Sequence, residues 1–373
     1  MSAAAPARLR IDVATGEVGL DAVDAVVPGP IPLVLRRAYR SLRTEPGPFG
    51  RGWTGPFDIA LAIDTETVRC VGGAFDGALF AAVAPGRAAR LDSGLVLEHH
   101  VHAFALWTSP RRRFVFDKRG GAEGRLPLSA IRDSGGGALT LDRRDGLVVR
   151  VDGPPGGPVR FTYGAAGAEA AVQGRSGRVL ARWDVRDGAL QSAAGTGRPT
   201  EHYAYDGERL VEHRAAGTTT FAQYDADGRA LALWGPGRAG IRVGYDARRH
   251  TTRVLEGDGS QTLYRYTPER QGLEMVHPDA TARVYYYGLG GALAGDGDAD
   301  GARAFQAFDP AEGRLLIVDH DLRAVAVDYD ADGRAVSAGP LDADAAPHLL
   351  SWSDAHTLAA LQTPAGHTWR FER

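Results

Sequence analysis

Apolar and polar residues alternate along much of the chain, in short runs separated by turn-forming residues. Between residues 251 and 266, for example, T-T-R-V-L and S-Q-T-L-Y-R-Y flank the turn sequence E-G-D-G. A period of two is the pattern of a half-buried β-strand, and Gly-rich tetrads that contain Asp-Gly are typical of hairpin turns. With 49 Gly and 21 Pro, the chain has turn residues at too many places for long helices. The pattern therefore predicts an all-β protein.

The alternating segments repeat with a period of about 21 residues. An aromatic residue, usually followed by Asp or Gly and then by a Gly-Arg turn, marks each unit, and five consecutive intervals are 21 residues long. The repeat-defining aromatics are Tyr163, Trp183, Tyr205, Tyr224, Tyr245, Tyr266, Tyr287, Phe308, Tyr329 and Trp352. Each unit holds two alternating segments and two turns, so one unit corresponds to one β-hairpin.

Repeated hairpins predict one long, curled sheet. The clearest units carry Y-D-A-D-G-R from Tyr224 and Tyr329, in which Asp and Gly form the turn and the aromatic residue faces inward. A single hairpin is marginal in water, so the units must pair edge to edge into a spiral sheet that buries its aromatic face. Open edges at the two ends of such a sheet invite self-association, and the N-terminal hundred residues, which lack the period, are a candidate β-rich cap.

Composition and charge exclude several classes of partner. Lys+Arg 43 against Asp+Glu 46 gives a net charge of −3, without the basic field that drives binding to nucleic acid or anionic membranes. Cys70 is the single cysteine, which excludes an intramolecular disulfide and is typical of a small buried apolar residue. No apolar run suits a signal peptide or a membrane span of about 18 residues. We expect a cytoplasmic protein whose export, if any, does not use a signal peptide.

The N-terminal segment adds a family resemblance. Residues 11–61 contain I-D-V-A-T-G-E-V, then P-G-P-I-P-L from Pro28, R-R-A-Y-R-S around Tyr39, and G-P-F-G-R-G-W ending at Trp53. This string resembles the domain that precedes the repeats in bacterial Rhs proteins, and the repeats resemble those of the YD-repeat, Rhs and teneurin superfamily. The resemblance implies a hollow β-shell that encloses a C-terminal toxin, often delivered by type VI secretion or a related apparatus.

The chain departs from that family near its C-terminus. Residues 308–319 match the family's core segment at Asp309, Pro310, Gly313 and Arg314, but His320 stands where the second Pro is expected. The sequence contains no toxin domain and no PAAR-type tip, and it is shorter than the family's closed shells. It is compatible both with a stand-alone short member and with a partial shell that needs a partner. We predict an Rhs-type N-terminal domain over 1–62, a β-rich connecting segment over 63–110 and a YD-repeat array over 111–373.

Two segments could hold a metal ion. If Glu98, His100 and His102 lay on one strand next to His99, they would share a face and could form a facial metal site, although strand histidines are more often solvated or satisfied in a core. The second segment, D-G-D-A-D-G, has the oxygen spacing of a calcium loop at Asp296, Asp298 and Asp300. Position twelve of that loop is Ala307, not Glu, and neighbouring units have turns at this place in the period. We favour a turn.

Other motifs have simpler interpretations. G-P-G-R-A-G from Gly235 matches a dinucleotide-binding pattern, but it falls between two predicted strands and lacks the helix that the pattern requires. The run Arg111 to Arg113 could contact phosphate or an acidic partner, or could be a solvated strand end, which we favour. The sequence contains no G-x-S-x-G elbow and no thiol signature of a nucleophile. No cofactor is implied.

Three hypotheses for function follow. The first is a non-catalytic shell or scaffold of a polymorphic-toxin or secretion system, which encloses or contacts a polypeptide cargo or a neighbouring toxin chain. The second is a β-sheet module that binds protein or carbohydrate through exposed aromatics. The third is an enzyme whose site lies near the segment His99–His102. A shell predicts a hollow volume, a binding module predicts an exterior patch, and an enzyme predicts a pocket in which several ionisable groups converge.

Overall fold

The computed structural model describes residues 7–91, 95–109, 111–121, 124–154, 157–163, 169–173, 177, 179–267, 272–287, 293–298, 303–309, 314–318, 323–330, 334–341, 346–353 and 358–371. Regular structure in these ranges is antiparallel β-sheet, apart from two single-turn 3-10 helices, η1 (Gly73–Phe75) and η2 (Lys118–Gly120). The all-β class is therefore confirmed. In the described ranges, no helix combines the length and the apolar character needed to span a bilayer.

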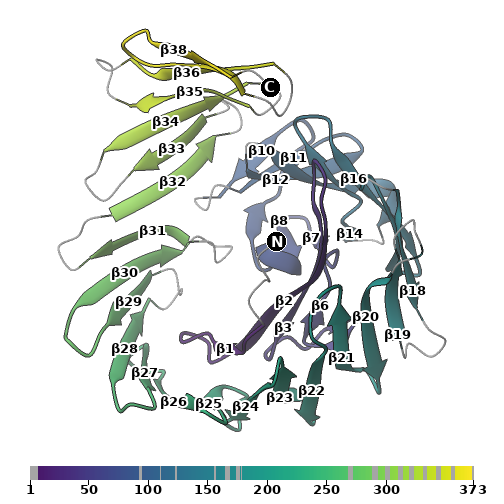
Figure 1. The fold of residues 1–373 in the computed structure, drawn as a ribbon, viewed down its shortest axis with the longest axis vertical. Coiled ribbons are helices and arrows are strands. Elements are labelled where there is room, and N and C mark those ends of the chain that lie inside the picture. The colour runs from purple at the N-terminus through teal and green to yellow at the C-terminus, as the bar shows by residue number, and fades with distance from the viewer. Residues whose placement is uncertain are drawn as a thin grey trace.

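One sheet contains 30 of the described strands and dominates the molecule. From β10 to β38, with β14 left out, each strand pairs with the next along the chain, which is the order expected of stacked hairpins. The short hairpin of β4 (Pro46–Gly47) and β5 (Gly50–Arg51) joins this sheet where Gly50 pairs with Ala189. Figure 1 shows the sheet curling through an open ring.

The consecutive strands of this main sheet are β10 (Ala88–Arg90), β11 (Val96–His99), β12 (Ala103–Ser109), β13 (Arg112–Asp117), β15 (Ala130–Asp133), β16 (Ala138–Arg144), β17 (Leu147–Asp152), β18 (Val159–Tyr163), β19 (Glu169–Gln173), β20 (Val179–Arg186), β21 (Ala189–Gly195), β22 (Glu201–Asp206), β23 (Arg209–Ala215), β24 (Thr218–Tyr224), β25 (Ala230–Gly235), β26 (Arg238–Asp246), β27 (Thr251–Leu255), β28 (Gln261–Tyr266), β29 (Gly272–Val276), β30 (Ala282–Tyr287), β31 (Leu293–Asp298), β32 (Arg303–Asp309), β33 (Arg314–Val318), β34 (Ala324–Tyr329), β35 (Ala335–Pro340), β36 (His348–Trp352), β37 (Leu358–Gln362) and β38 (Thr368–Arg370).

The repeat-defining aromatics occupy alternate strands of the main sheet. Their backbone positions lie at or near the ends of β18, β20, β22, β24, β26, β28, β30, β32, β34 and β36. Each of these strands is the first of a hairpin, so the period of about 21 residues advances the chain by two strands. The side chains of Tyr287 and Phe308 fall outside the described residues.

Hydrogen bonds from five of these aromatics join consecutive units. The hydroxyls of Tyr163, Tyr205, Tyr224 and Tyr245 donate to the carbonyls of Val148 (3.1 Å), Leu190 (2.9 Å), Leu210 (2.8 Å) and Ala230 (2.6 Å), and Trp352 Nε1 donates to that of Ala335 (2.8 Å). In all five cases, the strand pairing of the preceding hairpin contains a register shift. The acceptor is the first paired residue between that shift and the turn of the hairpin. A bulge disrupts the ladder and bends the strand, and the aromatic of the next unit contacts the chain at that place.

In the two Y-D-A-D-G-R units, the Asp directly after the aromatic and the Arg four residues later stabilise the turn. The Asp225 carboxylate accepts hydrogen bonds from the Arg229 backbone N (2.8 Å) and from Arg229 Nε (2.9 Å). Asp330 and Arg334 form the same pair of bonds, at 2.9 and 2.7 Å. The Arg229 guanidinium carbon lies 5.0 Å from the centre of the Tyr245 ring, so the arginine of one unit covers the tyrosine of the next.

Two small sheets from the N-terminal part lie inside the curve of the main sheet (Figure 1). The first contains β1 (Arg10–Ile11), β2 (Val18–Val27), β3 (Leu33–Arg40) and β6 (Trp53–Thr54), and the second contains β7 (Ala60–Ile63), β8 (Thr67–Val71), β9 (Leu79–Ala81) and β14 (Arg125–Pro127). Strand β2 contacts β20 and β21 of the main sheet. The approach is close, because a Cβ added at Gly195 on β21 would meet the Asp24 carbonyl oxygen at 2.0 Å.

The predicted domain boundaries do not coincide with sheet boundaries. Strands β10, β11 and β12 come from the predicted connecting segment 63–110 but belong to the main sheet, whereas β8 and β9 belong to a small sheet. Strand β14, from the predicted array, pairs with β7. The division into three domains stays a prediction, and the described strands show that the main sheet begins ahead of residue 111.

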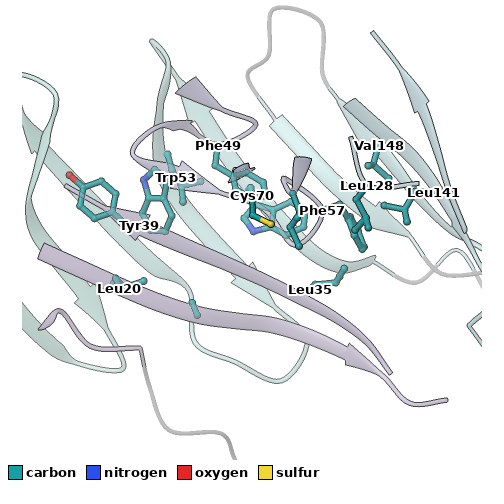
Figure 2. Packing of buried hydrophobic residues seen from close by; sticks show 14 of the residues in the cluster. Leu20, Leu35, Tyr39, Phe49, Trp53, Phe57, Cys70, Leu128, Leu141 and Val148 are labelled. Carbon is teal, nitrogen blue, oxygen red and sulfur yellow. The ribbon is translucent and has the colours of Figure 1, made fainter. Parts of the chain in front are cut away.

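The hydrophobic core lies between the small sheets and the first half of the main sheet. Leu20, Leu35 and Trp53 from the N-terminal part share one cluster with Leu141 and Val148 of the main sheet (Figure 2). Among the described residues, the last buried hydrophobic side chain along the chain is Val254 on β27. Strands β28–β38 continue the sheet beyond the core.

Removal of a single tyrosine hydroxyl tests the hydrogen bonds between units. We expect Tyr224→Phe to lower the free energy of unfolding by about 1 kcal/mol, because the Leu210 carbonyl loses its donor while the ring remains. Chemical denaturation measures the change. Tyr264→Phe is the matched control, since the Tyr264 hydroxyl has no hydrogen bond to a described residue. Equal effects of the two substitutions would contradict the proposed role of the hydroxyl.

Candidate functional site: a concave wall and its buried anchor

A buried arginine joins the N-terminal layer to the main sheet. The side chain of Arg37, on β3, is 0% exposed. Its Nε lies 3.1 and 3.0 Å from the two carboxylate oxygens of Asp24 on β2, and its Nη2 lies 2.9 Å from Glu201 Oε2 on β22. Its Nη1 donates to the Tyr203 hydroxyl. From its place on β3, one guanidinium thus bonds to a neighbouring strand of the inner layer, β2, and to one strand of the wall, β22.

Glu201 is the acceptor on the wall side. The Tyr203 hydroxyl donates to Glu201 Oε2, and His213 Nε2 on β23 lies 3.2 Å from the same atom. Burial alone would raise the pKa of Glu201, but the hydrogen bond with His213, the charge of Arg37 and the Tyr203 hydroxyl lower it to about 2. Arg37 also has a raised pKa, since two carboxylates outweigh its own desolvation. Both groups are therefore held in their charged forms.

Aromatic side chains enclose this ion cluster. Trp183 Nε1 donates to Asp24 Oδ2 at 2.7 Å, and Trp53 Nε1 donates to the Tyr205 hydroxyl at 2.8 Å. The Arg37 guanidinium carbon lies 5.2 Å from the centre of the Trp53 ring. These contacts exclude water, which strengthens the electrostatic interactions and makes a missing partner costly.

The anchor was not predicted from the sequence, although a signal for it exists. Strand β3 reads L-V-L-R-R-A-Y-R and alternates strictly in burial, so that Leu33, Leu35, Arg37 and Tyr39 share the inward face. An arginine at an inward position of an alternating strand indicates a buried partner of opposite charge. That partner, Glu201, lies 164 residues away in the sequence, so only the fold shows which residue it is.

The histidine segment does not form the predicted strand face. Strand β11 ends at His99, so His100 and His102 lie in the turn before β12, and the prediction that they share a strand face with Glu98 is wrong. His100 Nε2 lies 3.1 Å from Glu98 Oε2 in an exposed pair. His99 instead contacts the Val83 carbonyl through Nδ1 and accepts a 2.7 Å hydrogen bond from Lys118 Nζ. Among the described residues, no group of three metal-ligating side chains converges.

The acidic segment lies on a strand. Asp296 and Asp298 belong to β31, so the prediction of a turn is wrong for these two residues, and Asp300 lies outside the described residues. Gly235 ends β25 and Arg238 begins β26, which leaves Pro236 and Gly237 as a two-residue hairpin turn where the dinucleotide pattern had matched. Cys70 is buried on β8, and burial raises the pKa of its thiol to about 12.

The side chains of the repeat-defining aromatics differ in burial along the wall. Trp183 is 1% exposed, and Tyr163, Tyr205 and Tyr224 pack partly buried against the core. Tyr266, Tyr329 and Trp352 come later in the chain, where the described residues include no buried hydrophobic side chain, and all three are half-buried. The aromatic pattern of the wall therefore continues past the inner layer that covers its first half.

Two cavities border the inner layer. One of about 520 Å³ gathers ionisable groups, among them Arg43, Asp58, Arg125 and Arg143. Burial raises the pKa of Asp58, whose carboxylate accepts a 2.6 Å hydrogen bond from the Gly55 backbone N. The other cavity, of about 330 Å³, has a mainly apolar lining. The segment His99–His102 lines neither of them, and Arg37 is equally absent from both linings.

Comparison with known proteins supports the N-terminal resemblance in part. A family model described as a domain of unknown function (DUF6531) matches residues 10–77. No curated protein matches the chain. Similar solved structures include the crystal structure of TcdB2-TccC3-Cdc42, with 12% identity, a TM-score of 0.35, and coverage of 92% of this chain and 24% of that chain. Another is the Photorhabdus luminescens Tc holotoxin pore, with 10% identity, a TM-score of 0.35, and coverage of 92% and 24%.

The chain spans about a quarter of the length of the two similar structures' chains, which are 24% covered. With TM-scores of 0.35, the fold assignment rests on the strand order of this chain and not on either likeness.

The anchor predicts a large cost for removing its cation. We expect Arg37→Ala to lower the free energy of unfolding by about 3–5 kcal/mol, because Asp24 and Glu201 would remain buried without their counter-ion. Arg36→Ala is the control: its side chain is 50% exposed beside Asp21, and we expect a loss of at most about 1 kcal/mol. Urea denaturation of both variants measures the difference. A small effect of Arg37→Ala would show that the cluster does not hold the two layers together.

The depressed pKa of Glu201 predicts acid sensitivity. Its folded pKa of about 2 lies below the ordinary value of 4.5, so its contribution is fully present above pH 4.5 and is lost as the pH falls toward 2. The contribution amounts to about 3 kcal/mol. In denaturation series between pH 6 and 2, we expect Glu201→Gln to lose less stability than the wild type on acidification. Glu208→Gln, at an exposed position, should keep the wild-type dependence.

Proposed function

We propose that the chain is a non-catalytic YD-repeat shell or scaffold of an Rhs-type polymorphic-toxin or secretion system, and that its wall holds a polypeptide. The observation that carries this proposal is that the main sheet extends farther along the chain than the hydrophobic core does. The main sheet runs to Arg370, whereas the buried hydrophobic side chains of the described residues end at Val254. A sheet that keeps its aromatic face beyond its own core has a surface suited to a partner chain.

Support for a polypeptide partner comes from the kind of surface that is left. Tyr266 and Trp352 are half-buried, and Leu350, which is half-buried as well, lies on the same face of β36 as Trp352. Aromatic and aliphatic side chains on a concave wall can contact an unfolded chain at many places without demanding one sequence. Such a wall would act by sequestration, since a chain lying on it is shielded from solvent and from its target.

The inner layer supports this role indirectly. The N-terminal sheets cover the wall as far as β27, and the anchor at Arg37 holds them there, so the first half of the wall is closed by the chain itself. We propose that the cargo, or a neighbouring toxin chain, takes the corresponding place against β28–β38. We further propose cytoplasmic synthesis and, where the protein is exported, a route that needs no signal peptide.

Hydrogen exchange with a defined partner tests the proposal. The chain is co-expressed with the polypeptide encoded beside it, and amide exchange is compared for the free and the co-purified protein. We expect added protection on strands β28–β38 and none on β2 and β3, which the fold already protects. Protection elsewhere, or failure of the two chains to associate, would overturn the proposed role of the wall.

Two substitutions on opposite faces of the sheet distinguish binding on the concave face from non-specific association. We expect Tyr266→Ser to weaken association with the co-expressed chain by about tenfold or more, because it removes an inward aromatic contact. Trp234→Ser is the control: Trp234 is 42% exposed, and its neighbour Leu233 is buried, so the tryptophan lies on the outer face. Equal losses for both variants would indicate non-specific association instead of binding on the concave face.

A further inference from the structure

Buried hydrogen-bond donors without partners gather at one turn of the wall. Within the described residues, five buried side-chain polar atoms lack a hydrogen-bond partner, and four of them are Trp107 Nε1, Arg111 Nε, Arg112 Nε and Ser134 Oγ. These residues belong to the β12–β13 hairpin and to the neighbouring turn, where the Ser134 backbone N donates to the Arg111 carbonyl at 3.0 Å. Trp107 packs with Arg113 on the face of the sheet opposite Arg112, so Arg112 is the one of the four that borders the cavity described next. Arg111 and Arg112 are half-buried with their Nε atoms covered, so the predicted solvated strand end holds for these two residues only in part. Native structures seldom leave such groups unpaired, so the cluster needs a physical explanation.

The cavity of about 330 Å³ lies beside this cluster, and Arg112 forms part of its lining. Its volume falls at the lower end of the range of small-molecule sites, roughly 300–1,000 Å³. The lining combines β3 of the inner layer with β13, β15 and β16 of the wall. Most of it is apolar, including Leu33, Phe75, Phe114, Ile131 and Leu139.

Positive charge exceeds negative charge around the cavity. The charged lining residues are Arg36, Arg40, Arg112 and Asp21. Asp21 is already engaged, because it accepts hydrogen bonds from Arg36 at 3.0 Å and from Arg40 at 3.3 Å. Asp21 also accepts a hydrogen bond from Arg10, so both of its oxygens are engaged by arginines other than Arg112.

Arg112 has no ion pair with a described carboxylate. Asp133 stands opposite it in the β13–β15 ladder, but the Asp133 carboxylate accepts a 2.7 Å hydrogen bond from the Gly135 backbone N instead. A guanidinium with a buried, unpaired Nε is suited to an anion, since its planar donors match a carboxylate.

We propose that this cavity binds an apolar monocarboxylate, with the carboxylate at Arg112 and the hydrocarbon part among the apolar lining residues. The proposal goes beyond a scaffold role and does not require that the wall hold a cargo. Two sources could present this chemistry: a free medium-chain aliphatic acid, or the C-terminal residue of a polypeptide that ends in an apolar side chain.

Titration calorimetry of the whole chain tests the ligand chemistry. We expect hexanoate, octanoate and decanoate to bind with affinity rising about fourfold for each added methylene until the cavity is full. Octan-1-ol should bind at least about tenfold more weakly than octanoate, because it lacks the anion. A short peptide ending in Leu, compared with its C-terminal amide, distinguishes the polypeptide source from the free acid. Octanol binding as tightly as octanoate, or no binding by any carboxylate, would overturn the proposal.

Arginine variants test the position of the anion. We expect Arg112→Gln to weaken octanoate binding by about 10- to 100-fold, and Arg112→Lys, which keeps the charge but loses the planar fork, to lie between this variant and the wild type. Arg132→Gln removes the same charge from an exposed position on β15 outside the lining and should bind as the wild type does. Thermal unfolding confirms that each variant is folded. Unchanged binding in a folded Arg112→Gln variant would place the carboxylate elsewhere and overturn the assignment.

Discussion

The hydrogen bond from a tyrosine hydroxyl to a backbone carbonyl of the preceding hairpin connects the period of the sequence with the curvature of the wall. The carbonyl belongs to the residue just beyond a register shift, as at Leu210 for Tyr224 and at Ala230 for Tyr245. A bulge bends its strand and increases the local twist. The hairpins of β26–β27, β28–β29 and β32–β33 have no register shift, so the device does not recur in every unit. Where a bulge recurs together with an aromatic that reaches it, the hairpins are added at an angle and the sheet curls instead of extending flat.

Covering the concave face of a curled sheet stabilises it, because apolar side chains are removed from water. The inner layer covers it along the first half of the wall, and there the core is dense enough to hold a complete ion cluster around Arg37. Two carboxylates, a hydroxyl, the Trp53 indole and the Tyr203 ring surround that guanidinium, so its burial is compensated by contacts from both layers. The anchor therefore specifies how the two layers meet, and this placement also creates the cavities at the border between them.

The second half of the wall and the β12–β13 turn share one property. Both carry groups suited to contacts with a partner or ligand beyond the described residues. On the wall these groups are apolar, since Tyr266 and Trp352 lie on strands where the described residues include no buried hydrophobic side chain. At the turn they are polar, since Arg111, Arg112 and Trp107 keep unpaired donors. Unused apolar surface favours a large partner with many weak contacts, whereas unused buried donors favour a small anion with a defined geometry. The two features therefore point to different ligands.

The local pattern by itself determined the strand class, the hairpin unit and the aromatics that begin each unit, because alternation, turn chemistry and a 21-residue period are properties of neighbouring residues. Tertiary structure decided the rest. It ended β11 at His99, placed Asp296 on a strand, covered the Nε atoms of Arg111 and Arg112, and brought Glu201 to Arg37 across 164 residues. Side chains such as these depend on which distant strands lie against them, and burial and counter-charge are set by that packing. For this reason the sequence predicted the wall, and only the folded chain located the anchor and the cavities.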